Sequence, residues 1–452
     1  MTSVRDDKAT DPIPEETPDV PPGTIVRIQA QHFRSFRYLD VDLSRFHVLI
    51  GPNASGKSNL LDIVAFLGDF VNGGLDAAIG GDRALGIPLR APDARHLVWM
   101  QRENHFELAV EVVLPADRVS TPATKNGTGG RQWICRYDVR VEVEPSVRVV
   151  GESLWLKPLG NAPARQPDMF PDDRNDMTAP VTIRSGHRAP KGWKAVVRRN
   201  SEDPERIMFY AERTKWQNPF RIRADRSALA NLPDDEERFP AATWFKSLLR
   251  ERIHRLALSG EALRMPSPPI RRGPYLPDGS NLPWVVHELE KGNPQRLAQW
   301  LDHVREALPD IDELFTRERE EDRHRYLVVR YRSKLEAPSW TVSDGTLRLL
   351  ALTLLAYAPA DGIYLIEEPE NGLHPRALES VYQSLSSVYR SQVLLATHSP
   401  VLLAAASPSE LLCFAKTTDG ATQVVRGDRH PRLRKWRGTL DLGTLFASGL
   451  LG

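Results

Sequence analysis

Residues 51–58 of the 452-residue chain read Gly51-Pro52-Asn53-Ala54-Ser55-Gly56-Lys57-Ser58. This stretch matches the pattern G-x-x-x-x-G-K-[ST], in which a glycine-rich turn points backbone N–H groups at phosphate oxygens. An apolar, β-branched run at 46–50 precedes it, and a run at 59–67 that can form a helix follows it. This strand–loop–helix order distinguishes a phosphate loop from a glycine-rich turn that matches by chance. The sequence therefore predicts a nucleoside triphosphate site.

The residue types of the loop suit ATP with Mg²⁺. We expect the Lys57 ammonium to reach the β- and γ-phosphates and to act in catalysis, and the Ser58 hydroxyl to ligate Mg²⁺. The start of the following helix adds a partial positive charge. The predicted nucleotide-binding set of this region is Gly51, Pro52, Asn53, Ala54, Ser55, Gly56, Lys57, Ser58 and Asn59.

Composition excludes several classes of protein. The chain is 41% hydrophobic and 26% charged, which is typical of a globular protein, and its length suggests two or three domains. The net charge of +1 excludes a global field that attracts nucleic acid. Cys135 and Cys413 are the two cysteines, too few for a disulfide framework. No apolar stretch approaches the ~20 residues of a membrane span, so we expect a cytoplasmic protein without a membrane partner.

The chain divides into four segments by pattern. Residues 1–23 are charged and proline-rich and are expected to be a disordered tail. Residues 24–155 form an N-terminal lobe with the phosphate loop and an antiparallel sheet, built from strand-like runs at 106–112, 133–139 and 147–150. Residues 156–275 are an insertion with loop-like composition at 157–205 and helical spacing at 241–258. Residues 276–452 form a C-terminal lobe with helical spacing at 282–308.

A second motif cluster begins at Ser343-Asp344-Gly345, which opens a helix. A serine hydroxyl, a glycine N–H and a helix N-terminus together can bind an anion. Taken alone, the stretch is better explained as an ordinary capped helix. We include Ser343 and Gly345 among the nucleotide-binding residues because of the motifs that follow them.

The buried strand-like run at 362–366 ends in Glu367-Glu368. Acidic residues at the end of a buried strand are costly, unless they hold a metal or act on a ligand. Glu367 suits Mg²⁺ or its water shell, and Glu368 suits polarisation of the attacking water. The alternative is a pair of solvated glutamates. His398 follows the next strand-like run, at 392–397, and can bind a γ-phosphate or orient water, or it can be structural.

In this order, the motifs resemble the ATP-binding-cassette ATPases of SMC, RecF and OLD (overcoming lysogenisation defect) proteins. The stretches 343–348, 367–375 and 397–400 resemble those of stand-alone bacterial OLD-like ATPases, as do Phe33-Arg34-Ser35-Phe36, 277–283 and 441–449. The resemblance covers about 24–67 and 275–450. It implies an α/β P-loop NTPase of the ABC/SMC-head type, with a mixed sheet core, an adjoining antiparallel sheet and a helical insertion. It also places Arg34 in the nucleotide site.

The resemblance further implies a homodimer that sandwiches two ATP molecules. Lys57, Ser58, Glu367, Glu368 and His398 of one subunit would meet Ser343 and Gly345 of the other. Many relatives carry Asp-Glu where this chain has Glu367-Glu368, so ligation of Mg²⁺ by Glu367 can be direct or through water. Gln101 is a candidate for the glutamine-loop residue, with an ordinary surface glutamine as the alternative. Full OLD nucleases continue into a Toprim domain, and the segment after His398 has no Asp-x-Asp pair for it.

These features favour a dimeric ATPase that controls a separate effector, a nuclease or a toxin, in anti-phage defence or DNA repair. One alternative is an ATP-dependent interaction scaffold with little turnover, and another is the ATPase subunit of a transporter. The long separation of Lys57 from Ser343 argues against the transporter. Two locally basic segments, 184–199 with Trp193 and 429–437 with Trp436, can bind nucleic acid or can be solvated loops.

Overall fold

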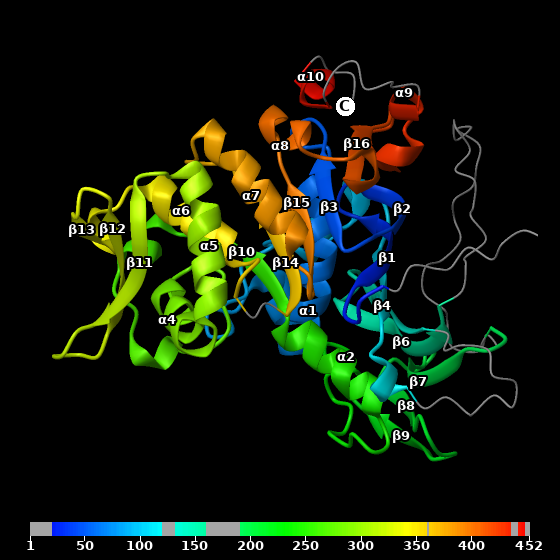
Figure 1. The fold of residues 1–452 in the computed structure, drawn as a ribbon. Coiled ribbons are helices and arrows are strands. Elements are labelled where there is room, and N and C mark those ends of the chain that lie inside the picture. The colour runs from blue at the N-terminus through cyan, green and yellow to red at the C-terminus, as the bar shows by residue number, and fades with distance from the viewer. Residues whose placement is uncertain (1–19, 120–131, 160–189, 359–360, 435–441, 448–452) are drawn as a thin grey trace, which may run out of the picture.

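The computed structural model describes residues 20–119, 132–159, 190–358, 361–434 and 442–447. Its core sheet has six strands, in the order β10 (Ile253–Leu256), β14 (Gly362–Glu367), β15 (Ser391–Ala396), β3 (Phe46–Ile50), β16 (Leu411–Lys416) and β17 (Thr422–Arg426). Neighbouring strands are parallel except for β16 and β17, which are antiparallel. This is the mixed sheet that the sequence predicts (Figure 1).

A second, antiparallel sheet of eight strands adjoins the core. Its order is β2 (Phe36–Asp42), β1 (Ile25–Phe33), β4 (His105–Val113), β5 (Trp133–Glu142), β6 (Arg148–Pro158), β7 (Lys194–Arg199), β8 (Arg206–Tyr210) and β9 (Gln217–Arg221). The prediction of loops across 157–205 is wrong at β7, since β7, β8 and β9 extend this sheet. β9 is exposed along its whole length, so it lacks the alternation of apolar residues that identifies a strand.

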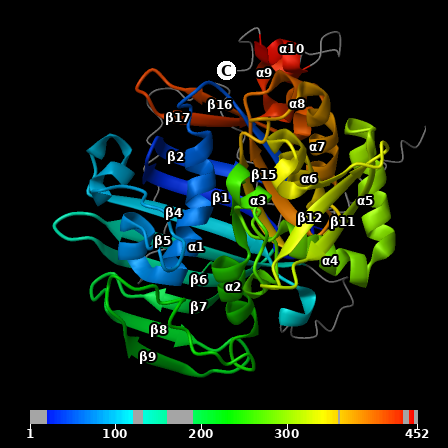
Figure 2. The same cartoon turned by 90° about the vertical axis from the view of Figure 1, so that its left-hand side faces the viewer.

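Helix α1 (Lys57–Gly80) lies between the two sheets, and α2 (Pro240–Glu251) packs beside it (Figures 1 and 2). Alternate residues of each core strand face opposite layers. In β3, Leu49 joins the core that contains α1, whereas Val48 and Ile50 join the core on the other face. That second core contains α6 (Asp344–Leu354), α7 (Pro375–Ser387) and α8 (Pro400–Ala404).

Within the described part of the chain, α1 is the one helix that is long and apolar enough, by length and composition, to cross a membrane. Inside the protein, 72% of its apolar stretch is buried. This burial follows from its position between two sheets, where a helix is apolar on all sides. The parallel strands β3, β14 and β15 end at one edge of the core sheet. The N-terminus of α1 lies at the same edge, because the loop after β3 leads directly into this helix.

The remaining elements flank the second core. They are α3 (Gly260–Arg264), α4 (Leu282–Gly292), α5 (Pro294–Ala307), β11 (Ile311–Glu318), β12 (Arg325–Tyr331), β13 (Glu336–Pro338), α9 (Pro431–Arg434) and α10 (Leu442–Ala447). Two predicted helical segments need correction. The segment 282–308 is divided, because the Asn293 side chain caps a new helix that has Pro294 in its first turn. The segment 241–258 is helical to Glu251 and then continues as β10.

The N-terminal tail is described in part. Residues 1–19 lie outside the described residues. The next four are attached to the antiparallel sheet, since Val20 N–H donates to Gln132 Oε1 at 3.4 Å and Gly23 N–H donates to the Val113 carbonyl at 2.9 Å. Contact with the sheet therefore starts before residue 24, the residue at which the sequence predicts the N-terminal lobe to begin.

Candidate nucleotide-binding site

The phosphate loop connects the buried strand β3 to the first turn of α1. Gly56 has a φ of 105°, and a Cβ there would lie 2.6 Å from Thr422 Oγ1 and 2.7 Å from Ser35 Oγ. Glycine is therefore required at this position by both conformation and space. Ala54, inside the loop, also has a positive φ of 58°. The loop thus has the compact, left-handed turns that direct successive N–H groups inward.

Lys57 folds back over this loop. Its ammonium donates to the carbonyls of Gly51 at 2.9 Å and Pro52 at 3.0 Å. Burial lowers the pKa of Lys57, and the nearby carboxylates of Glu368 and Glu367 oppose that shift. The positive charge is therefore held at the loop, with acidic groups close enough to stabilise it.

Ser58 and Glu367 meet directly, although they are far apart in the sequence. Ser58 Oγ donates to Glu367 Oε2 at 2.5 Å. In the core sheet, Glu367 is level with Ala396 of β15, and Ala396 is level with Leu49 of β3, so the end of β14 lies at the edge where the loop begins. Neighbouring ligand oxygens around Mg²⁺ lie about 3 Å apart, so this all-oxygen pair fits that ion after a small separation. The structure thus brings the two predicted metal ligands together.

Glu368 follows β14 in a strained conformation. Its φ is 47°, and its N–H donates to the Ala396 carbonyl at 2.8 Å. Its Oε2 accepts from Asn371 Nδ2 at 2.7 Å. Left-handed backbone at a residue other than glycine is costly and is concentrated at functional sites. Asn371 was not singled out from the sequence, but it orients the predicted base.

Glu370 links the acidic segment to His398. Its Oε1 accepts from the Thr397 hydroxyl at 2.7 Å and from the His398 N–H at 2.8 Å. Its Oε2 is buried and has no hydrogen-bond partner among the described residues. The half-buried His398 is therefore placed through its backbone by a carboxylate from the neighbouring segment. Glu370 was part of the motif, but no role for it was predicted.

Ser343 and Gly345 lie at the start of helix α6. Ser343 caps α6, and its Oγ accepts from the Thr346 N–H at 3.2 Å. A Cβ at Gly345 would lie 2.7 Å from the Gly372 carbonyl, so α6 packs against the segment after Glu368. Among the described residues, neither Ser343 nor Gly345 hydrogen-bonds to residues 51–59 of its own chain.

The polar side chains of Ser35, Asn59 and Thr422 form a hydrogen-bonded chain that reaches the phosphate loop at the Ser55 carbonyl. Ser35 Oγ accepts from Asn59 Nδ2 at 2.7 Å and lies 2.8 Å from Thr422 Oγ1. Thr422 Oγ1 also lies 2.8 Å from the Ser55 carbonyl. Thr422, on β17, was missed because a single threonine far from the motif carries no recognisable pattern. Asn59, predicted to bind nucleotide, points its amide at Ser35.

Arg34 is directed at helix α1. Its Nε lies 2.8 Å from Asp62 Oδ2 in an ion pair, so its position at the nucleotide stays a prediction. Gln101, the candidate glutamine-loop residue, is exposed at the end of the short helix η2 (Trp99–Gln101) and has a φ of 53°.

The two basic segments are not uniform exposed patches. In 184–199, Arg199 is fully buried and pairs with Glu152 at 3.1 Å, whereas Lys191 and Lys194 are exposed. Arg184 and Arg188 lie outside the described residues. In 429–437, Arg429 and Arg432 are exposed, and residues 435–437, which include Trp436, lie outside the described residues. Binding of nucleic acid by either segment stays a prediction.

Comparison with known proteins places the chain among proteins of similar sequence and fold. A 45-residue stretch is 40% identical to the chromosome partition protein Smc of Methanocaldococcus jannaschii, which is 10% of this chain and 4% of that protein. The chain thus spans a small fraction of that relative. A solved structure, the Smc head bound to the C-winged helix domain of ScpA, is similar with a TM-score of 0.50 and 16% identity, over 89% of this chain and 96% of that one. The SMC head domain from Thermotoga maritima matches with a TM-score of 0.39 and 12% identity, over 89% and 98%.

The likeness to the Smc head shows the fold, that of a P-loop ATPase head of the SMC type. The family model described as "AAA domain, putative AbiEii toxin, Type IV TA system" matches residues 46–111 and 184–404, more than half of the chain. The chain therefore belongs to this family of AAA-domain proteins.

Proposed function

We propose that this chain binds ATP with Mg²⁺ and hydrolyses it as a homodimer. The hydrogen bond between Ser58 Oγ and Glu367 Oε2 carries the proposal, because it brings together the two side chains that would hold a phosphate-bound metal. Membership of an AAA-domain family supports the choice of ATP.

The side chains of this chain have distinct roles in the proposed reaction. Lys57 exchanges its two loop carbonyls for phosphate oxygens and stabilises their charge. Glu368, oriented by Asn371, accepts a proton from the attacking water. His398, positioned by Glu370, binds the γ-phosphate or that water. Bound Mg²⁺ would neutralise charge on the phosphate oxygens, held by Ser58 and Glu367 directly or through water.

The position of α6 supports the homodimer. Ser343 and Gly345 make no hydrogen bond to their own phosphate loop among the described residues, yet a capped helix N-terminus can bind phosphate oxygens. Two-fold symmetry would bring each α6 to the ATP bound by the partner subunit. Each ATP would then be held by both subunits.

Mixing two inactive variants tests the shared site. Lys57→Ala and Ser343→Arg should each lower hydrolysis at least about 100-fold alone. In an equimolar mixture, half of the dimers are mixed, and each mixed dimer has one intact and one doubly damaged site, so about one quarter of wild-type activity should return. The measurement is phosphate release over a range of mixing ratios. If no activity returns, or if Ser343→Arg alone is fully active, the shared site is refuted.

The biological part of the proposal is control of a separate effector, a nuclease or toxin, in cytoplasmic anti-phage defence or DNA repair. The family description, which mentions a toxin of a type IV toxin–antitoxin system, supports a defence setting. The ATP site supports a switch that closes on ATP and reopens after hydrolysis.

A phage challenge tests this role. Phage should form plaques less efficiently on cells that carry this gene with its neighbouring genes than on cells without them. Lys57→Ala should remove this protection. Protection that persists in Lys57→Ala argues against ATP control. Growth arrest by this chain alone, without any neighbouring gene, argues against a separate effector.

A further inference from the structure

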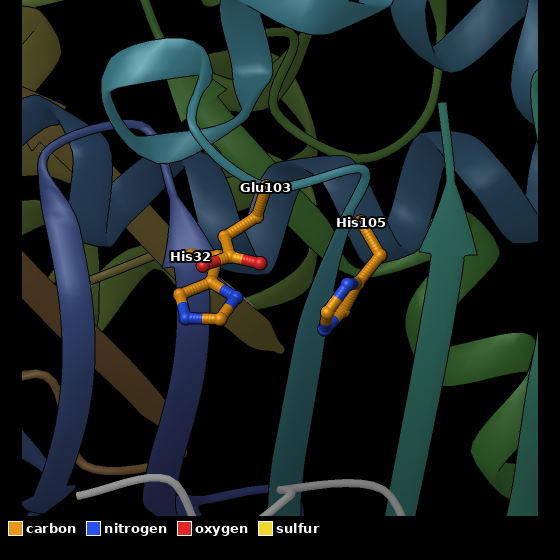
Figure 3. A group of neighbouring side chains, drawn as sticks. All are labelled: His32, Glu103 and His105. Atoms are coloured by element: carbon orange, nitrogen blue, oxygen red, sulfur yellow. The ribbon is translucent and has the colours of Figure 1, made fainter. Parts of the chain in front are cut away.

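Three potential metal ligands converge on the antiparallel sheet, at residues not used by the proposed ATPase. His32 lies near the end of β1, Glu103 lies in the segment before β4, and His105 is the first residue of β4. One ligand atom from each side chain lies within 4.8 Å of the other two. Figure 3 shows the Glu103 carboxylate beside the His32 ring, with the His105 ring facing the same space.

The backbone of β1 is distorted where it supplies His32. The φ of His32 is 55°, a left-handed value that is uncommon within a strand. The adjacent Phe33 is completely buried and packs against Phe106 with ring centroids 5.3 Å apart. The two imidazole rings meet edge to face, with centroids 5.2 Å apart and planes at 72°. The fold thus accepts backbone strain at a residue whose ring reaches His105.

The hydrogen bonds of the two histidines leave nitrogen atoms for a ligand. His32 Nδ1 is buried and has no hydrogen-bond partner among the described residues. A buried polar atom without a partner is costly and calls for an explanation. His105 Nδ1 lies 3.0 Å from Asn104 Oδ1. A proton on Nδ1 would be donated to that amide oxygen, which leaves the lone pair of Nε2 free, as in metal-binding histidines.

The local charges also suit a cation. The nearby Arg140 is neutralised by Glu107, with Nη1 and Oε1 2.6 Å apart. Glu103 is exposed, so its carboxylate can turn toward the rings.

We propose that His32, Glu103 and His105 form a binding site for Zn²⁺. Two imidazoles and one carboxylate are borderline to hard donors that favour zinc over Mg²⁺ or Ca²⁺, which prefer oxygen. Zinc-bound ligand atoms in a tetrahedron lie about 3.3 Å apart, so binding would draw the three side chains closer, with water as the fourth ligand.

Bound zinc would link two segments that lie near the phosphate loop. β1 continues from His32 into the turn that carries Ser35, which supports the loop through Asn59. The segment with Glu103 follows η2 and is tied to the same turn, since the Arg34 N–H donates to the Leu97 carbonyl at 2.7 Å. Zinc would therefore stabilise this corner of the sheet, and its binding does not depend on ATP hydrolysis.

Zinc binding can be measured on tag-free, full-length protein that has been stripped with a chelator. Mg²⁺ in excess should keep Ser58 and Glu367 from taking up zinc. Metal analysis after dialysis should give one Zn²⁺ per chain, and Co²⁺ should give the visible spectrum of a tetrahedral site. Zinc should raise the Tm, since it binds the folded state.

The variants His105→Asn, His32→Asn and Glu103→Gln should each weaken zinc binding by at least about tenfold. Asparagine at position 32 tolerates the left-handed backbone. His96→Asn is the matched control, because His96 is exposed on η1 (Ala94–Leu97), outside the cluster. It should bind zinc as the wild type does. The proposal is overturned if the wild type retains no zinc, or if Glu103→Gln and the folded histidine variants bind it with unchanged affinity.

Discussion

Replacing Lys57 by alanine is expected to lower ATP hydrolysis by about 10²- to 10³-fold, the usual effect of removing one charged group that stabilises a reaction's developing charge. The Lys57 ammonium lies on the carbonyls of Gly51 and Pro52, directly within the loop. No other Lys or Arg side chain among the described residues hydrogen-bonds to these carbonyls. ATP binding should weaken as well, because the lost charge acts on the bound substrate.

Phosphate release and nucleotide titration measure this effect. Lys416→Ala is the matched control, since Lys416 is exposed at the end of β16 in the same sheet. The control should retain wild-type activity and show the same circular dichroism as Lys57→Ala. Unchanged hydrolysis in Lys57→Ala would refute the enzymatic part of the proposal.

Glu368→Gln is expected to lower hydrolysis by about 10²- to 10⁴-fold, the range for loss of a general base. Glutamine has the same shape and keeps an oxygen that accepts from Asn371 Nδ2, so the segment should retain its conformation. ATP should still bind, because Lys57 and Ser58 are unchanged. The variant should therefore accumulate as an ATP-bound dimer, which light scattering after gel filtration can detect.

The control for this variant is Glu379→Gln, an exposed glutamate on α7. It should hydrolyse ATP and remain in the same monomer–dimer equilibrium as the wild type. Full hydrolysis by Glu368→Gln would assign the base to another group. A trapped dimer that works normally in cells would instead favour the scaffold over the ATPase switch.

The parts of the site that are contiguous in sequence could be predicted. The phosphate loop, the acidic pair and His398 each follow an apolar strand, and parallel strands place such residues at one edge. The pairing of Ser58 with Glu367 follows from that rule. The positions of Asn371 and Glu370 within the motif were visible, but their hydrogen bonds depend on the turn after β14, which a sequence pattern does not specify.

Other features depend on tertiary contacts that have no local signal. Thr422 supports the loop from β17, and it looks like any strand threonine in the sequence. The four-residue strand β10 is identified by its pairing with β14 rather than by its composition. β9 is exposed along its length, so the expected alternation is missing. The division between α4 and α5 did have a local signal, the Asn293-Pro294 pair, which the continuous apolar spacing masked.

The hydrogen bond from Thr422 to the Ser55 carbonyl joins residues that are 367 positions apart. A ribosome adds about 5–20 residues per second, so the loop would emerge about 20–70 s before its last support is synthesised. β3 can complete its strand pairing only after β15 and β16, its two neighbours in the sheet, have been synthesised. A growing chain therefore displays its phosphate-loop sequence long before the strand that supports the loop exists, and the proposed nucleotide site can be completed only after Thr422 has been synthesised.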